Sequence, residues 1–209
     1  MSSIIHQLNL YRRYPYWSKA KCVYIHIPKA AGTSINKALY GRTLGHYQAI
    51  EIRKRFPELF NKSFVFSIVR NPWSRTYSAY KFAKMGRTES MGVKNPAQYQ
   101  IPEFDSFEQF IFDWLMKKNT IECDYIFQPQ HLFVCDNKGN LITDFIGKVE
   151  NISNDFQLIS TQLSREITLP FANKTSNIND YKIAYKSNEM IEAVAKIYRK
   201  DIELFEYQF

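Results

Sequence analysis

The segment 27–34 (IPKAAGTS) has the residue types of an anion-binding loop, and it ends a predicted strand and opens a predicted helix. Lys29 supplies a positive charge. Thr33 and Ser34 supply hydroxyl groups at the helix N-terminus, where backbone N–H groups lack partners within the helix. Gly32 has no side chain, so the backbone can come close to a ligand. The segment therefore predicts a cradle for a phosphate or sulfate group.

This loop differs from the P-loop that binds nucleoside triphosphates, GxxxxGK[ST]. The lysine lies three residues before the glycine, and the first glycine of that motif is missing. The apolar run 64–69 (FVFSIV) is followed by Arg70 rather than by an acidic residue that would hold Mg²⁺. A kinase or ATPase is therefore disfavoured, and Mg²⁺-dependent binding of ATP in preference to other nucleotides would be needed to restore it.

A second segment, 70–80 (RNPWSRTYSAY), follows the second predicted strand. Arg70 leaves the strand, and Ser78 lies eight residues later, two turns into a predicted helix. An arginine can bind phosphate through two N–H groups, and a nearby hydroxyl can complete the site. Taken alone, the pair also fits a surface arginine and a helix serine with no joint role.

Together the two segments resemble the sulfotransferases that use 3′-phosphoadenosine 5′-phosphosulfate (PAPS). The pattern R-[DN]-P-x-x-R-x-x-S-x-Y is similar to that of their carbohydrate branch, with Asn71 where Asp is commoner. Further segments look like the middle and the C-terminal part of the same family. These segments are 128–131 (QPQH), Cys135, 144–156, 173–176 (NKTS) and 198–209, so that the resemblance covers roughly residues 23–209.

Two strand–loop–helix units within the first 85 residues predict an α/β fold with a mainly parallel sheet. The resemblance implies a P-loop-like three-layer sandwich, in which helices flank this central sheet. It also implies a single sulfotransferase domain over residues 1–209.

The resemblance assigns roles to individual residues. The loop after the first strand would hold the 5′-phosphosulfate, with Lys29 also stabilising charge during transfer, and Arg70 and Ser78 would bind the 3′-phosphate. The residues expected to bind PAPS are Lys29, Ala30, Ala31, Gly32, Thr33, Ser34, Arg70, Ser78 and Lys174. Arg75 and Tyr80 match the pattern but are expected to have structural roles. No metal is implied, and the sequence offers no evident metal site.

A general base should take the proton of the acceptor. Carbohydrate sulfotransferases often carry a base histidine between the two PAPS-binding segments, and His46 lies there. Glu51, about one turn further on, is its main rival, followed by Glu103. His26 lies within the first predicted strand, and we expect it to face the core.

The remaining elements are predicted from periodicity and turn signals. Residues 1–20 are expected to form a packed arm, and residues 85–103 a long loop. Further helices are predicted at 73–84, 106–117, 151–163 and 187–205, and further strands at 131–135 and 141–149.

The formal net charge is +8, from 28 Lys and Arg against 20 Asp and Glu. This charge also fits a non-catalytic domain that binds nucleic acid or another polyanion, but basic and aromatic residues interleave only in the N-terminal arm. No run of 18 apolar residues and no signal peptide is present. We therefore expect a cytoplasmic, bacterial enzyme that acts on a carbohydrate or glycan acceptor, with peripheral contact to a lipid-linked acceptor left open.

Overall fold

The computed structural model describes residues 4–87, 92–93, 95–169 and 180–209. The chain divides into two compact units. The first consists of Met1–Val69 and His131–Asn173, and the second of Arg70–Gln130 and Lys174–Phe209. The division falls directly after the second strand, so the two predicted anion-binding segments belong to different units.

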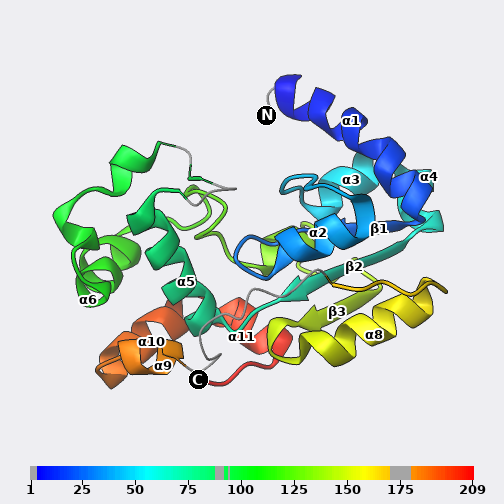
Figure 1. The fold of residues 1–209 in the computed structure, drawn as a ribbon. Helices are drawn as coiled ribbons and strands as arrows, with labels where there is room; N and C mark the ends of the chain where they lie inside the picture. Colours follow the sequence, from blue (N-terminus) through cyan, green and yellow to red (C-terminus); the bar gives the residue numbers. More distant parts are fainter. Residues whose placement is uncertain (1–3, 88–91, 94, 170–179) are drawn as a thin grey trace. The chain divides into compact units, whose positions relative to one another are not determined.

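A three-stranded parallel sheet forms the centre of the first unit (Figure 1). Its strands are β1 (Cys22–Ile25), β2 (Phe64–Val69) and β3 (Phe145–Lys148), in the order β1-β2-β3. Cys22 pairs with Phe64, and Phe66 pairs with Phe145. Residues of β1 and most residues of β2 are buried, as expected for strands covered on both faces. The parallel sheet and the strand at 64–69 are confirmed.

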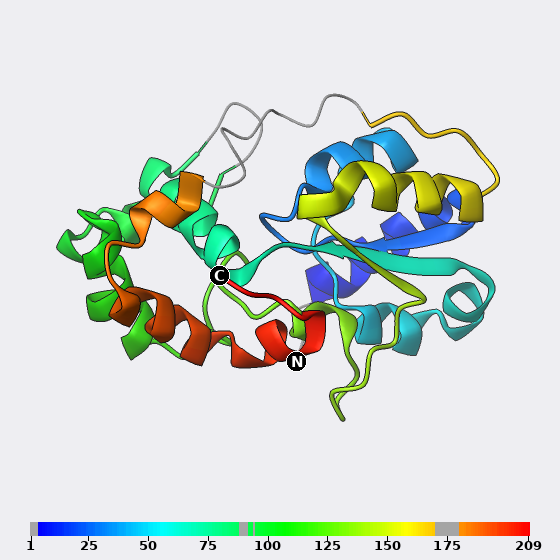
Figure 2. The ribbon, with the colours of Figure 1, turned by 90° about the horizontal axis from the view of Figure 1, so that it is seen from below.

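Helices cover both faces of this sheet (Figure 2). On one face lie α2 (Gly32–Tyr40) and α8 (Ile152–Gln162), and on the other α3 (Ala49–Arg55) and α4 (Pro57–Lys62). The core under α2 and α8 is a single apolar cluster formed by Cys22, Tyr24, Ile35, Leu39, Phe66, Ile68, Phe156 and Ile159. The predicted α/β sandwich with a parallel central sheet flanked by helices is confirmed.

The N-terminal arm is a helix, α1 (Ile4–Ala20), which packs beside β1 and α2. Leu10, Trp17 and Ala20 are buried, so the arm is packed as expected. Its helical form was not predicted, because aromatic and basic residues alternate there and Pro15 lies inside the helix. Proline removes one backbone hydrogen bond and usually argues against a helix interior.

The strand predicted at 131–135 is wrong. His131–Val134 is a short helix, α7, and the Cys135 N–H donates to the His131 carbonyl at 2.9 Å. A short apolar run can be buried as either helix or strand, and periodicity alone does not separate the two. The strand predicted at 141–149 is shorter than expected, because Leu141 forms only an isolated bridge with Cys135 before β3 begins.

The second unit begins with α5 (Pro72–Met85). Pro72 occupies its first turn as predicted, and the Asn71 side chain caps it by accepting from Trp73 N–H and Ser74 N–H at 3.1 and 3.3 Å. The segment after α5 contains two short 3₁₀ helices, η1 (Pro96–Tyr99) and η2 (Pro102–Phe104), so it is not wholly a loop.

Two predicted helices of the second unit are interrupted. In the segment 106–117, Ser106 caps α6 (Phe107–Gln109) as expected, but a π-helical stretch, η3 (Phe110–Trp114), and a 3₁₀ turn, η4 (Leu115–Lys117), follow. The C-terminal helix is divided at Tyr198 into α10 (Asn188–Ile197) and α11 (Arg199–Phe205), with a short helix, α9 (Asp180–Ala184), before them. Tyr198, the residue at the break, is buried, and its hydroxyl donates to the Phe127 carbonyl at 2.8 Å.

Candidate active site

The loop between β1 and α2 has an unusual backbone. Lys29 and Ala31 both have positive φ angles, 67° and 58°, in the left-handed region that residues with a Cβ rarely adopt. Ala31 precedes α2 and caps it with no side-chain hydrogen bond. Ala31 thus offers no side chain to the first N–H groups of the helix, where the positive end of the helix dipole also lies. This arrangement is suited to hold an anion.

Gly32, the first residue of α2, lies against the ring of His26. A Cβ placed on Gly32 would be 1.9 Å from Cδ2 and 2.1 Å from Nε2 of His26. No side chain fits at such distances unless the ring moves. The sequence indicates one reason for a glycine here, which is that a ligand can then approach the backbone, and the structure shows a second reason, which is the close packing of the His26 ring.

His26 directly follows β1 and is only 5% exposed, so the expectation that it faces the core is confirmed. Its ring centroid lies 4.1 Å from that of His46. Burial, and next the charge of the neighbouring His46, lower the pKa of His26 well below its usual value, while a backbone hydrogen bond with Gly45 opposes them. His26 is therefore neutral at pH 7.

His46 lies in the irregular segment 43–48 before α3 and is half-buried. Its Nδ1 is 3.0 Å from the backbone carbonyl oxygen of His26. A carbonyl oxygen can only accept, so Nδ1 carries the hydrogen, and the lone pair of the neutral ring lies on Nε2. Leu44 anchors this segment, because its carbonyl accepts from Arg13 Nε at 2.8 Å and its N–H donates to Asn36 Oδ1 at 3.3 Å. The Nδ1–H of His46 is thus held by His26, whose ring also packs against Gly32.

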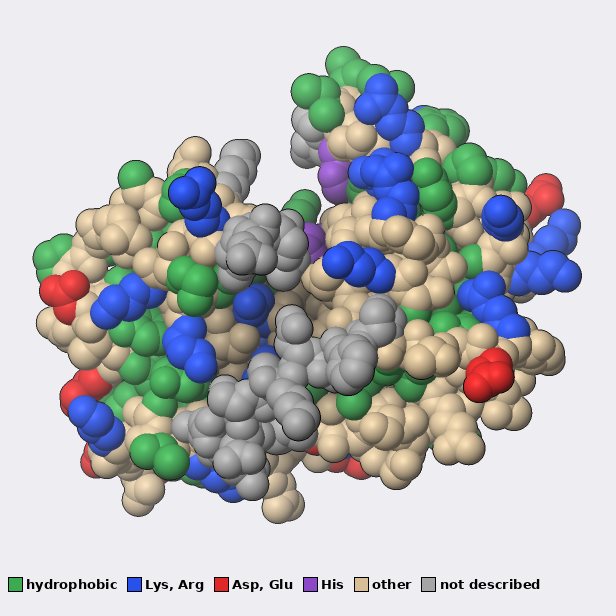
Figure 3. Space-filling model, viewed as in Figure 1, with side chains coloured by type: hydrophobic (Ala, Val, Ile, Leu, Met, Phe, Trp, Pro, Cys, Tyr) green, Lys and Arg blue, Asp and Glu red, His purple; other side chains and the backbone are tan. Residues whose placement is uncertain are grey.

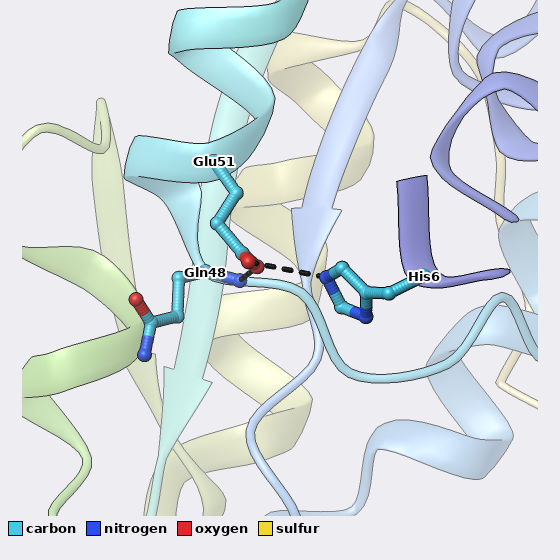
Figure 4. A network of polar contacts seen from close by, with 3 residues as sticks. All are labelled: His6, Gln48 and Glu51. Atoms are coloured by element: carbon cyan, nitrogen blue, oxygen red, sulfur yellow. Dashed lines mark hydrogen bonds and ion pairs between the residues drawn. The ribbon is translucent and has the colours of Figure 1, made fainter. Parts of the chain in front are cut away.

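Both carboxylate oxygens of Glu51 have structural partners (Figure 4). Oε1 lies 3.1 Å from His6 Nε2, and Oε2 accepts from the Gln48 N–H at 3.0 Å, which satisfies a donor at the start of α3. These contacts give Glu51 a role in tying α1 to α3. Glu103, the third candidate base, lies in η2 of the second unit and is half-buried.

Arg70 directly follows β2 and is held by Gln130 and Ser74. Its N–H donates to Gln130 Oε1 at 2.9 Å, and its carbonyl accepts from Gln130 Nε2 at 2.8 Å. Gln130 is fully buried, and its own N–H donates to Asp201 Oδ2 at 2.6 Å. The Arg70 side chain donates through Nε to Ser74 Oγ at 2.9 Å, so its guanidinium has a defined direction.

Arg75 and Tyr80, in the segment 70–80, bond to backbone carbonyls, as expected for structural roles. Arg75 is 2% exposed and donates to the Gln128 and Tyr125 carbonyls at 2.9 and 3.3 Å, and the Tyr80 hydroxyl donates to the Phe104 carbonyl at 3.1 Å. Both have structural roles. Ser78 is half-buried on α5. Lys174 and the rest of the segment 173–176 lie outside the described residues.

Sequence reasoning did not foresee two residues of this arrangement. His26 was expected to be only a core residue, yet its carbonyl and ring both contact the site. Gln130 was noted as part of QPQH, but a sequence gives no sign that one amide would bond both backbone groups of a residue 60 positions away. The position of His26 beside the loop motif was the only available signal.

The described residues contain no group of three His, Cys, Asp or Glu side chains that could hold a metal ion. No helix in the described part of the chain is long and apolar enough to span a lipid bilayer. On the face shown in Figure 3, Lys and Arg side chains are spread over both units.

The comparisons with known proteins give one match. The model of a family described as "Sulfotransferase family" matches residues 14–208, which is nearly the whole chain. No curated protein and no solved structure matches in the corresponding comparisons.

Proposed function

Because the chain belongs to the sulfotransferase family, which implies PAPS-dependent sulfuryl transfer, we propose that it transfers a sulfuryl group from PAPS to a hydroxyl group of a carbohydrate or glycan acceptor. PAPS supplies the activated sulfuryl group and leaves as 3′-phosphoadenosine 5′-phosphate. The whole of residues 1–209 acts as one sulfotransferase domain in this proposal.

The observation that carries the proposal is the loop between β1 and α2. Two left-handed residues, Lys29 and Ala31, lead into α2, and Ala31 at its N-cap position has no side chain that could cap it. We assign the 5′-phosphosulfate to this loop, with Ala30, Ala31 and Gly32 contributing backbone and Thr33 and Ser34 hydroxyl groups. Lys29 stabilises the negative charge that develops on the oxygen between phosphorus and sulfur.

Arg70 and Ser78 bind the 3′-phosphate in this proposal. The Nε of Arg70 is already directed by Ser74 Oγ at 2.9 Å, and its backbone is fixed on both sides by Gln130. A guanidinium held in this way loses little freedom when it binds a phosphate. Lys174 is proposed as a further contact to PAPS.

His46 acts as the general base. Its Nδ1–H is donated to the His26 carbonyl, so Nε2 takes the proton of the acceptor hydroxyl. As the acceptor oxygen forms its bond to sulfur, the bond from sulfur to the bridging oxygen breaks. Glu51 is a weaker candidate than His46, because both of its carboxylate oxygens have partners in the fold.

The cofactor assignment is tested by calorimetric titration with 3′-phosphoadenosine 5′-phosphate. The unaltered chain should bind this nucleotide, and Lys29→Ala should weaken binding by about 10- to 100-fold, the value of a hydrogen bond to a charged group. Lys37→Ala is the matched control, because Lys37 is exposed on α2 and should leave binding unchanged. Failure of the unaltered chain to bind the nucleotide, with salt-sensitive binding of oligonucleotides instead, would favour a polyanion-binding domain.

The acceptor class is tested separately with PAPS and a panel of neutral and acidic glycans. Incorporation of sulfate into at least one glycan is expected. Transfer confined to phenols or tyrosine-containing peptides would contradict a carbohydrate acceptor while leaving the family activity intact.

A further inference from the structure

The outward side of α1 carries apolar side chains that the fold leaves largely or half exposed. Ile4, Ile5, Leu8 and Tyr11 are 79%, 71%, 53% and 48% exposed. At about 100° per residue, these four lie with Pro15 in a sector about 120° wide, opposite the side that buries Leu10, Trp17 and Ala20. Isolated exposed apolar residues are ordinary, but a contiguous group on one helix marks a contact surface.

The same sector becomes basic further along the helix. Arg12 and Lys19 lie within it, and Arg55 of α3 stacks over the Tyr11 ring at 4.5 Å from its centroid. Figure 3 shows apolar side chains at the start of α1 and Lys or Arg side chains further along it. The surface is therefore apolar at one end and cationic at the other.

The surrounding sequence contains no opposite charge. The first 50 residues carry no Asp or Glu, and the first acidic residue is Glu51. Within them are seven cationic residues: Arg12, Arg13, Lys19, Lys21, Lys29, Lys37 and Arg42. Nearly all of the net charge of +8 is thus contributed by this part of the chain.

We propose that the outward side of α1 docks on an anionic lipid membrane, with the first two turns inserted among the acyl chains and the basic residues at the headgroups. An interfacial helix of this kind combines large aliphatic side chains with Lys and Arg, and tyrosine rings suit the boundary. A polysaccharide or nucleic acid would satisfy the charge but would leave Ile4, Ile5 and Leu8 in water. A lipid surface satisfies both the charge and the apolar area.

The test uses the purified 209-residue chain and sedimentation with vesicles. Vesicles contain phosphatidylcholine alone or with phosphatidylglycerol. We expect the chain to bind the anionic vesicles and to bind the neutral vesicles more weakly. Binding to the anionic vesicles should fall as the salt concentration is raised.

The combined variant Ile4→Ser, Ile5→Ser and Leu8→Ser should lower the partition coefficient at least about tenfold. Arg12→Gln should lower it about fivefold.

Leu158→Ser and Ile183→Ser are the matched controls, because these residues are 58% and 82% exposed on other helices. Both should bind vesicles like the unaltered chain, and circular dichroism checks that every variant is folded. Three outcomes would overturn the proposal: no binding to anionic vesicles, binding that the combined variant leaves unchanged, or self-association through α1 without vesicle binding. Binding to heparin in the absence of vesicle binding would also overturn it. None of these outcomes depends on sulfuryl transfer.

Discussion

His26 and His46 contact each other twice, once through their rings, whose centroids are 4.1 Å apart, and once through the His26 carbonyl, which lies 3.0 Å from His46 Nδ1. The same His26 ring occupies the space where a side chain at Gly32 would lie. One buried histidine therefore links the end of β1, the start of α2 and the proposed base. Substitutions at His26, Gly32 and His46 can separate these three contacts.

His46→Gln should lower kcat by about 10²- to 10⁴-fold, the usual contribution of a positioned general base. The fall of kcat/KM toward acidic pH should also flatten, because this limb reports protonation of the base. Steady-state rates across pH with PAPS and a glycan acceptor measure both effects. Glu51→Gln is the comparison: it should lose stability but keep most of its kcat, because Glu51 contacts His6 and Gln48. A larger loss of kcat in Glu51→Gln than in His46→Gln would reverse the two assignments.

Gly32→Ala should lower the free energy of unfolding by about 1–3 kcal/mol, because the added methyl group overlaps the His26 ring. Urea denaturation measures this change. His26→Ala removes the ring, so Gly32→Ala should cost less in that background than in the unaltered chain. Equal costs in the two backgrounds would show that the ring is not the obstacle.

The depressed pKa of His26 makes stability depend on pH. Folding disfavours its protonated form, so the unfolded chain binds the proton more readily as the pH falls below about 6.5, the ordinary histidine value. The stability associated with neutral His26 is complete above that pH and is lost below it, by up to about 1.4 kcal/mol per pH unit. Urea midpoints measured between pH 7.5 and about 5 should therefore fall more steeply for the unaltered chain than for His26→Asn. Parallel curves would contradict this origin.

Arg70→Ala should weaken binding of 3′-phosphoadenosine 5′-phosphate by about 10- to 100-fold while leaving adenosine 5′-phosphate binding unchanged, because only the first ligand has a 3′-phosphate. Calorimetry with both nucleotides measures this selectivity. Ser74→Ala should have a smaller effect of the same kind, since Ser74 Oγ only directs the guanidinium. Arg199→Ala, which removes an exposed ion pair with Glu203, should change neither affinity. Equal losses for both nucleotides would mean that Arg70 does not read the 3′-phosphate.

The sheet and the helices that follow its first two strands could be predicted from the sequence because their signals are local. The run 64–69 is continuously apolar, and Pro72 marks the start of α5. His131–Val134 could not be assigned, since four apolar-rich residues fit a helix turn and a strand equally well. The break at Tyr198 was not predicted either, and the residue at the break bonds through its hydroxyl to Phe127, which is distant in sequence.

The residues of the candidate site, Lys29 and Arg70 among them, were assigned from motif and position, and these assignments stay predictions. The tautomer of His46 could not be predicted, because it depends on a carbonyl 20 residues away. The structural role of Glu51 depends on its contact with His6. His6 lies on α1, and the sequence did not predict that this segment is a helix. Contacts between segments of this kind decide which of several plausible residues can act.

The left-handed backbone at Lys29 and Ala31 has an evolutionary consequence. Each such residue costs roughly 1–2 kcal/mol relative to an ordinary conformation. The folded chain bears this cost permanently, so a ligand meets donors that are already organised and need not be ordered on arrival. Selection for stability alone would favour glycine at Ala31, which relieves the strain but frees the loop. The alanine at position 31 therefore costs the folded chain stability and keeps the loop more constrained than a glycine would.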